Sequence, residues 1–233
     1  MAKGSVKYEQ EGDVAVLRLD DGRANAISHQ VIGALGHALD RAEKEARSVL
    51  LLGRPGRFSA GFDLGTMGEG PEAATELVGA GARLLLRFYE LPLPLVAGCT
   101  GHALAMGALM LLASDSRVGA RGDFKIGLNE VAIRMVLPLF GVELGRARLS
   151  RRHLQRAVVQ AEIYDPDGAV DAGFLDRAVA PEALQEEALA EATRLAQLPR
   201  RAFAETKLRV RRPTLETIRA TLEDDLASFG AES

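Results

Sequence analysis

Residues 56–64 read GRFSAGFDL, and they follow closely on the apolar stretch SVLLLG at residues 48–53. A stretch this continuously apolar is typical of a strand that is buried on both faces of a sheet. The Gly, Ser and Ala residues after it let the backbone come close to another group, because their side chains are small. The transition therefore predicts either a turn whose backbone meets a phosphate or an oxyanion, or a tight turn in a packed domain.

The same order of elements, an apolar strand, a turn of small residues and a helix, occurs again later in the chain. PLVAGC at residues 94–99 predicts a second strand, and ALAMGALMLLAS at residues 103–114 predicts the helix that follows it. Between the two units, leucines at helical spacing predict a helix that starts at Pro71 and runs to about Glu90. Repetition of this unit predicts an α/β fold with parallel strands.

The chain changes character at residue 181. Residues 181–233 read as charged amphipathic helices divided by Pro199 and Pro213, whereas residues 1–180 carry the alternating strands and helices. We therefore predict a core of residues 1–180 and a C-terminal helical region of residues 181–233. An apolar helix face needs a surface to cover, so this region is expected to pack on its own core or on another subunit.

The composition is that of an ordinary globular protein. The 233 residues are 47% hydrophobic and 26% charged, with a formal net charge of −3, which gives no reason to expect nucleic acid or an acidic membrane as a partner. The single Cys99 excludes an intramolecular disulfide and a cysteine-based metal cluster, and the four histidines show no metal-ligand spacing. We predict a cytoplasmic protein.

One stretch tests this prediction of a soluble protein. Residues 91–114 carry no charged side chain and are long enough to span a bilayer. However, Pro92 and Pro94 open the stretch, and AGCTGH interrupts it at residues 97–102. A strand, a turn and a buried helix explain this pattern better than a membrane span does.

Two common routes to nucleotide binding and one to hydrolysis are poorly matched. The chain has no P-loop ending after GRPGRFSAGFDL and no G-x-G-x-x-G after a strand. Ser59 lies in G-x-x-S-x-G, which is one residue longer than the G-x-S-x-G turn of serine hydrolases. A serine hydrolase that uses Ser59 stays open as an alternative.

Three segments together resemble the crotonase superfamily of enoyl-CoA hydratases and isomerases: GRFSAGFDL, then GHALAMGALMLLASD at residues 101–115, then FKIGLNEVAI at residues 124–133. DGRANAIS at residues 21–28 is similar to a fourth segment of the family, and the resemblance covers nearly the whole chain in the family's order. It implies a crotonase-like spiral of repeated ββα units. The C-terminal helices of the family pack trimers, often paired into hexamers, so a homotrimer or hexamer is expected.

The resemblance implies an oxyanion hole that is made of two backbone N–H groups, those of Ala60 and Met106. Such a pair polarises a thioester carbonyl and stabilises the enolate that forms when a proton leaves the neighbouring carbon. The family usually has Gly at the second position, so the Met106 side chain has to turn away from the substrate. Coenzyme A enters as part of the substrate, and no metal or redox cofactor is implied.

For the coenzyme A part of the substrate, the resemblance implies two binding segments. Arg23 and Ala24 match the segment that lines the nucleotide. The other segment consists of Gly61, Phe62, Asp63 and Leu64, of which the last two begin a helix over the pantetheine.

The acid/base positions separate the activities within the family. Family hydratases use two Glu, one to activate water and one to supply a proton. The first falls at Leu109, which cannot transfer protons, and the second falls at Glu130. Related isomerases keep only the second Glu, so Glu130 as the single acid/base residue favours isomerisation over hydration of an enoyl-CoA.

A second departure from the family pattern lies at Arg134, where the family generally has Gly. If the segment is helical, Glu130 and Arg134 share a face, and an ion pair would hold Glu130 charged and make it a weaker base. Leu109 and Arg134 therefore favour a further alternative, an acyl-CoA-binding protein of the same fold without catalysis.

Overall fold

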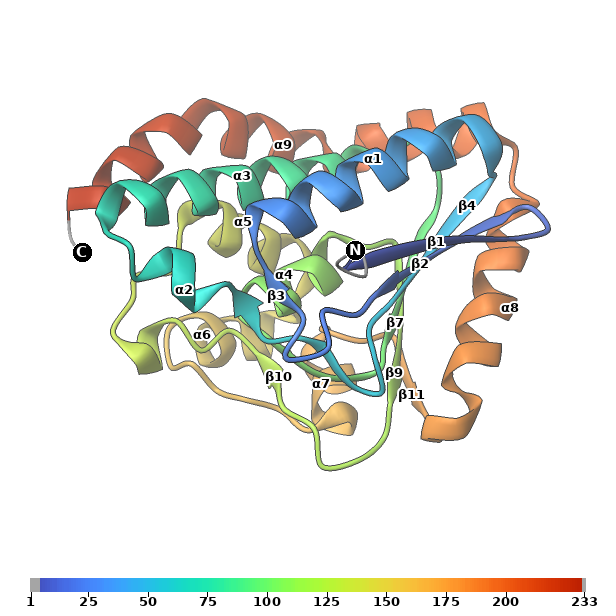
Figure 1. Cartoon of the computed structure of the whole chain (residues 1–233), viewed down its shortest axis with the longest axis horizontal. Coiled ribbons are helices and arrows are strands. Elements are labelled where there is room, and N and C mark those ends of the chain that lie inside the picture. The colour runs from blue at the N-terminus through green and yellow to red at the C-terminus, as the bar shows by residue number, and fades with distance from the viewer. Residues whose placement is uncertain (1–4, 232–233) are drawn as a thin grey trace.

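The computed structural model describes residues 5–231 of the chain, and its largest sheet holds six strands in the order β1-β2-β4-β7-β9-β11 (Figure 1). These strands are β1 (Val6–Glu11), β2 (Val14–Leu19), β4 (Ser48–Leu52), β7 (Leu95–Cys99), β9 (Ser116–Ala120) and β11 (Arg177–Val179). β1 and β2 form an antiparallel hairpin, and the other neighbouring strands are parallel. Every residue of β4 and β7 is buried, as the continuous apolar stretches predict.

Two smaller parallel sheets lie beside the large one. β5 (Gly56–Ser59), β8 (Gly101–Leu104) and β10 (Ile126–Gly127) form one, and β3 (Ala26–Ile27) and β6 (Gly61–Phe62) form the other. β4, β7 and β9 each pass directly into a strand of the three-stranded sheet. This repeated step from one sheet to the other confirms the predicted spiral of ββα units.

One face of the large sheet is covered by α1 (His29–Glu45), α3 (Pro71–Glu90) and α4 (Met106–Ala113). All eight residues of α4 are buried, so this helix belongs to the hydrophobic core. The apolar stretch 91–114 is divided among β7, β8 and α4, and none of the helices in the described residues is long and apolar enough to cross a membrane. The remaining short helices are α2 (Leu64–Met67), η1 (Val131–Ile133), α6 (Arg151–Val158), α7 (Pro166–Ala172) and η2 (Pro181–Ala183).

The C-terminal helices cover both sides of their own chain's core. α8 (Leu184–Ala196) packs on the face of the sheet opposite α1 and α3, and it closes a second hydrophobic cluster with side chains of β2, β4, β7 and β9 (Figure 1). α9 (Arg200–Ala231) runs along α3 and α5 (Leu139–Arg148). Its buried apolar side chains are Leu215, Ile218, Leu222 and Leu226.

The prediction that Pro213 divides two helices is wrong, because α9 continues through it. Proline inside a helix removes one backbone hydrogen bond and costs about 3 kcal/mol. The apolar face after Pro213 offsets this cost by packing against α3 and α5. Pro199 does separate α8 from α9, as predicted.

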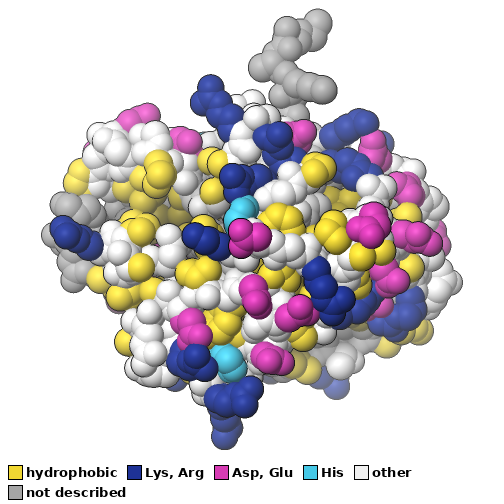
Figure 2. All heavy atoms as spheres, turned by 90° about the horizontal axis from the view of Figure 1, so that it is seen from below, with side chains coloured by type: hydrophobic (Ala, Val, Ile, Leu, Met, Phe, Trp, Pro, Cys, Tyr) yellow, Lys and Arg dark blue, Asp and Glu magenta, His cyan; other side chains and the backbone are white. Residues whose placement is uncertain are grey.

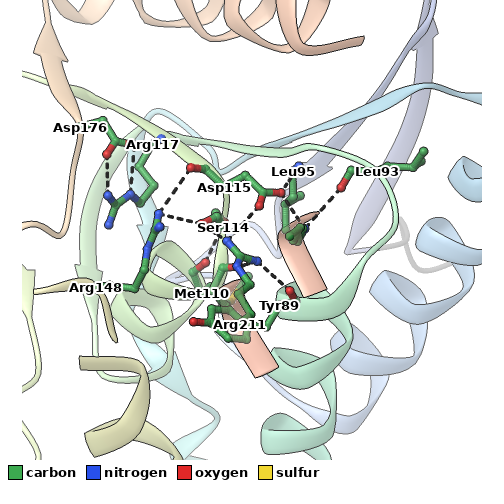
Figure 3. Close-up of polar contacts among 12 residues, drawn as sticks. Tyr89, Leu93, Leu95, Met110, Ser114, Asp115, Arg117, Arg148, Asp176 and Arg211 are labelled. Atoms are coloured by element: carbon green, nitrogen blue, oxygen red, sulfur yellow. Dashed lines mark hydrogen bonds and ion pairs between the residues drawn. The ribbon is translucent and has the colours of Figure 1, made fainter. Parts of the chain in front are cut away.

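Before Pro213, α9 is fixed to the sheet by a buried ion cluster around Asp115 (Figure 3). The Asp115 carboxylate accepts a hydrogen bond from Lys207 Nζ at 2.7 Å and forms an ion pair with Arg211 Nη2 at 2.9 Å. Arg211 also donates to the Tyr89 carbonyl oxygen at 2.7 Å, and its guanidinium lies 4.1 Å from the centre of the Tyr89 ring. The cluster thereby joins α9, the end of α3 and the start of β9.

Candidate active site

A cavity of about 750 Å³ opens where β6, α2, α4 and η1 meet. Its lining includes these residues of the predicted site: Arg23, Ala24, Ala60, Phe62, Asp63, Leu64 and Glu130, together with Leu109. Gly61 and Met106 lie in the loops behind this lining. The fold therefore brings three distant segments, at residues 21–26, 60–67 and 105–140, to one cavity.

Part of the predicted oxyanion hole is corrected by the structure. The Ala60 N–H donates to the Ala24 carbonyl oxygen at 3.0 Å, so it is already used and cannot also bind an acyl oxygen. Farther along the strand, the Asp63 N–H donates to Ile27 of β3 at 3.1 Å. Because N–H groups alternate in direction along a strand, the Phe62 N–H points away from β3. Phe62, which lines the cavity, is therefore the candidate for the first donor in place of Ala60.

The second donor is placed by a strained turn at the start of α4. Met106 is the first residue of this helix, and the first N–H groups of a helix have no partner within it. The preceding Ala105 has φ 48° and ψ −121°, a backbone conformation that is costly for a residue with a side chain. Backbone strain of this kind clusters at functional sites, where it orients a particular group.

The loops that carry the two donors touch each other. A Cβ atom added to Gly61 would lie 3.0 Å from Ala105 Cβ and 3.7 Å from the Met106 nitrogen. The Met106 side chain is fully buried, and its Cε would lie 3.4 Å from a Cβ atom on Gly81 of α3. This side chain therefore packs into the core, which leaves its backbone N–H beside Gly61 and Phe62.

Among the carboxylates that line the cavity, only that of Glu130 is buried and has an oxygen without a hydrogen-bond partner in the described residues. Its side chain is 8% exposed, and its Oε2 atom has no hydrogen-bond partner among the described residues. Burial raises the pKa of Glu130 to about 7, and a hydrogen bond from its own backbone lowers it by less. A carboxyl group with a pKa near neutrality can both accept and return a proton at physiological pH.

Arg134 does not pair with Glu130. Residues 131–133 form a single 3₁₀ turn, and Arg134 ends it in the left-handed conformation, with φ 66° and ψ 29°. Its side chain is exposed, and none of the ion pairs in the described part of the chain joins it to Glu130. The helical arrangement that would have placed the two on one face is therefore wrong. The left-handed backbone is also a physical reason for Gly at this position in the family.

Neither Leu109 nor Ser59 has surroundings that suit a catalytic side chain. Leu109 is buried on α4 and lines the cavity, so an apolar side chain occupies the position that would activate water in a hydratase. Ser59 Oγ donates to the Asn25 carbonyl oxygen at 2.8 Å and accepts from the Gly61 N–H at 3.2 Å. These backbone bonds hold the Ser59 hydroxyl inside the turn, and no histidine is among its partners in residues 5–231, so the hydrolase alternative has no support.

The segment that contains Arg23 and Ala24 is shaped by its neighbours. The Asp21 carboxylate accepts from the N–H groups of Arg23, Asn25 and Ala26 at 2.7–3.0 Å, and these bonds outweigh burial and lower the pKa of Asp21. Burial is the largest single influence on this pKa and acts in the opposite direction. Asp21, Arg23, Ala24 and Ala26 of the resulting loop line the cavity.

Asp63 and Leu64 lie at the other side of the cavity. The Asp63 carboxylate caps α2 by accepting from the Thr66 N–H at 3.0 Å. Leu64 is 78% exposed. An apolar side chain this exposed at the edge of a cavity is suited to contact a bound ligand.

The lower face of the molecule carries a mixed surface. Figure 2 shows acidic, basic and apolar side chains interspersed over it, without a broad basic patch among the described residues of this face.

A cavity that combines free N–H groups with a buried carboxyl group of raised pKa is the arrangement expected of an enzyme that stabilises an oxyanion while a proton moves. The model of the enoyl-CoA hydratase/isomerase family matches residues 9–232. The chain belongs to this family, which confirms the resemblance seen in the sequence.

Individual relatives carry both family activities in their names. The chain is 30% identical over 229 residues to the mitochondrial enoyl-CoA delta isomerase 1 of Homo sapiens, covering 96% of this chain and 76% of the relative. It is 34% identical over 200 residues to a putative enoyl-CoA hydratase of Thermus thermophilus, covering 81% and 76% of the two chains.

Solved structures match the whole fold. An enoyl-CoA hydratase/isomerase family protein from Pseudomonas syringae is 45% identical, with a TM-score of 0.94 and coverage of 96% of this chain and 97% of that one. Human mitochondrial delta3-delta2-enoyl-CoA isomerase is 29% identical, with a TM-score of 0.93 and coverage of 97% and 91%.

Proposed function

We propose that this protein is an enoyl-CoA isomerase that moves a double bond from position 3 to position 2 of an enoyl-CoA thioester. The observation that carries the proposal is the buried carboxyl group of Glu130, which among the described carboxyl groups of the cavity is the one with an oxygen that has no hydrogen-bond partner. Glu130 is present with a pKa near 7, and the position of the water-activating Glu is occupied by Leu109. Hydration requires water to be activated, whereas moving one proton between two carbons does not.

In this mechanism the Glu130 carboxylate removes a proton from carbon 2 of the 3-enoyl-CoA. The electron pair of the broken C–H bond delocalises over the double bond and the thioester, and the negative charge on the thioester oxygen is bound by the N–H groups of Phe62 and Met106. The protonated Glu130 then returns the proton to carbon 4, which leaves the double bond at position 2. The proton and the electrons balance within the substrate and Glu130, so the proposal needs no resident cofactor.

The substrate is proposed to enter with coenzyme A along the two segments at the outer part of the cavity. Arg23 and Ala24 line it on one side, and Phe62, Asp63 and Leu64 line it on the other. The exposed Leu64 and the capped start of α2 are placed to cover the pantetheine arm.

Assembly and location are part of the proposal. The family resemblance supports a homotrimer or hexamer, although the apolar faces of α8 and α9 already pack on their own chain. The single, unpaired Cys99 supports a reducing compartment such as the cytoplasm. Sedimentation or light scattering tests the assembly, since a protein that stays at the 24.9 kDa mass of one chain at micromolar concentration contradicts it.

Separate incubations with 3-enoyl-CoA and 2-enoyl-CoA test the reaction. We expect the first to be converted to 2-enoyl-CoA, and the second to give no 3-hydroxyacyl-CoA above the background rate. Formation of 3-hydroxyacyl-CoA would instead identify a hydratase. Binding of both compounds without conversion of either would favour the acyl-CoA-binding alternative, which Leu109 supports and Arg134 no longer does.

A further inference from the structure

The buried end of the active-site cavity is closed by the ring of Phe140. This residue belongs to the first turn of α5 and is 2% exposed. It lines the cavity together with Val78 of α3 and Leu109 of α4, which are also buried, whereas Leu64 marks the exposed part. Phe140 therefore lies at the end that an acyl chain would reach last.

A second, narrow space lies behind the same ring. It is enclosed by α3, α5 and α9 and is too narrow to hold a water molecule. Its lining is apolar apart from one tyrosine and consists of Ala82, Leu85, Leu86, Tyr89, Phe140, Leu144 and Ile218. A methylene group is no smaller than a water molecule, so this apolar space can take acyl carbons only when a side chain of its lining becomes smaller.

The cavity and this space are two sections of one groove along α3. Val78 lines the cavity, and Ala82, Leu85 and Tyr89 line the space behind it. Residues at these spacings lie on the same face of a helix. Phe140 is the side chain shared by the two linings, so its ring is the partition between them.

The partition is held in place by α9. The residue before α5 is Pro138, whose side chain cannot cap the helix, and Asp225 of α9 supplies the missing acceptor. Its Oδ2 atom accepts from the Leu139 N–H at 2.7 Å, so the first turn of α5, including Phe140, is fixed to α9. Burial raises the pKa of Asp225, and its hydrogen bonds from Leu139 and Phe140 act in the opposite direction.

We propose that Phe140 sets the upper limit on the length of the acyl chain. This inference rests on the proposed function in one respect, that the cavity binds the acyl group of an acyl-CoA. A chain that reaches the ring cannot extend further along α3. A smaller residue at position 140 joins the two spaces and admits longer chains.

Binding of saturated acyl-CoA thioesters of increasing length, from butyryl to palmitoyl, tests the inference without requiring turnover. Each methylene that enters an apolar cavity should tighten binding by about four-fold. In the unaltered protein, this gain should stop at the length at which the chain meets Phe140. In Phe140→Ala the gain should continue for additional carbons beyond that length, and in Phe140→Leu for fewer.

Leu144→Ala is the matched control. Leu144 lines the narrow space behind Phe140 but not the cavity, and it lies one helical turn after Phe140. Its truncation therefore enlarges the narrow space without removing the ring that separates it from the cavity. Circular dichroism and thermal unfolding establish which variants fold. If Phe140→Ala does not fold, Phe140→Leu carries the test, because a leucine keeps most of the apolar packing.

The outcomes separate this inference from the isomerase proposal. A limit that moves in the Phe140 variants and not in Leu144→Ala supports the inference, even if no isomerisation is found. A limit that is the same in all four proteins overturns it, although acyl-CoA binding stands. Absence of acyl-CoA binding to the unaltered protein overturns both.

Discussion

Two carboxylates in the interior of this protein have opposite surroundings. Asp115, whose side chain is 12% exposed, receives hydrogen bonds from Lys207 and the Leu95 N–H and forms an ion pair with Arg211 (Figure 3). Glu130 is similarly buried, but its Oε2 atom has no partner in the part of the chain that the structure describes. The first carboxylate fixes a helix to a sheet, whereas burial raises the pKa of the second to about 7, because only a hydrogen bond from its own backbone opposes this effect.

Burial also disfavours the charged form of the basic side chains around Asp115. Burial is the main cause that lowers the pKa of Lys207, to about 8, and the Asp115 charge offsets only part of this effect. Arg148 donates to the carbonyl oxygens of Ser114 and Asp115, and burial, with Arg117 and Arg211 nearby, lowers its pKa to about 10. Burial therefore shifts pKa values in both regions. Among the described residues, Asp115 has cationic partners, whereas Glu130 in the active site has none.

The largest effect is expected when the unpaired carboxyl group is removed. Glu130→Gln keeps the size of the side chain but cannot accept a proton, so conversion of 3-enoyl-CoA should fall by roughly 10²–10⁴-fold. Acyl-CoA affinity should stay within a few fold, because the hole and the cavity walls are unchanged. Steady-state kinetics and calorimetric binding measure the two quantities, and a fall of less than ten-fold would place the proton transfer elsewhere.

Removing the paired carboxylate should act on stability instead. Asp115→Asn leaves Lys207 and Arg211 buried without a counter-charge, and breaking such a pair costs about 3–5 kcal/mol. Urea unfolding measures this loss. The exposed Arg41–Glu45 pair supplies the control, since Glu45→Gln should change the free energy of unfolding by no more than about 1 kcal/mol. Equal losses in the two variants would mean that the Asp115 cluster does not fix α9.

The two regions should also respond to pH in opposite directions. Glu130 has a folded-state pKa of about 7 against 4.5 as its ordinary value, so the folded state holds an extra proton between these pH values. Its contribution to stability is present below pH 4.5 and is lost as the pH rises to 7, by about 3 kcal/mol at most. Over the same window kcat/KM should rise as the carboxylate forms.

Lys207 acts at higher pH. Its pKa falls from an ordinary value of 10.5 to about 8, so its contribution to stability is present above pH 10.5 and is lost as the pH falls to 8. The effect of Glu130 is measured by unfolding curves of the unaltered protein and of Glu130→Gln between pH 4.5 and 7. A slope that persists in Glu130→Gln would assign it to another group.

The smallest effect is expected at Arg134, which lies near Glu130 in sequence and makes no ion pair with it. Arg134→Gly should leave activity unchanged, and relief of the left-handed backbone should shift stability by no more than about 1 kcal/mol. Thermal unfolding and kinetics under the conditions used for Glu130→Gln make the comparison direct. A several-fold rise in activity would show that Arg134 does restrain the carboxylate in solution.

The elements predicted best are those whose signals are local. Leucine spacing and Pro71 placed α3 at the residues where it lies, and continuous apolar stretches identified β4 and β7. Pro213 misled the prediction of the helical tail because a local rule met a long-range packing surface on α3 and α5. Such a surface is not visible in the sequence around the proline.

Within the site, side-chain identities were easier to predict than backbone directions. Glu130, Leu109 and the two loops of small residues follow from sequence, and they meet at one cavity. The choice between Ala60 and Phe62 depends on a hydrogen bond to Ala24, which lies 36 residues earlier in the chain. The positive φ of Gly61 and Ala105, which shapes both donor loops, is likewise set by tertiary contacts.

The bond between Asp225 and the start of α5 has a consequence for how the protein is made. All residues that line the cavity, Phe140 included, precede α9 in the chain. The wall that holds Phe140 is nevertheless complete only when α9 has been synthesised and has docked. On a ribosome, the nascent chain therefore displays the apolar groove of α3 before its cover exists. Chaperones that hold exposed apolar segments would meet this groove first, and acyl-CoA would bind only after they have left.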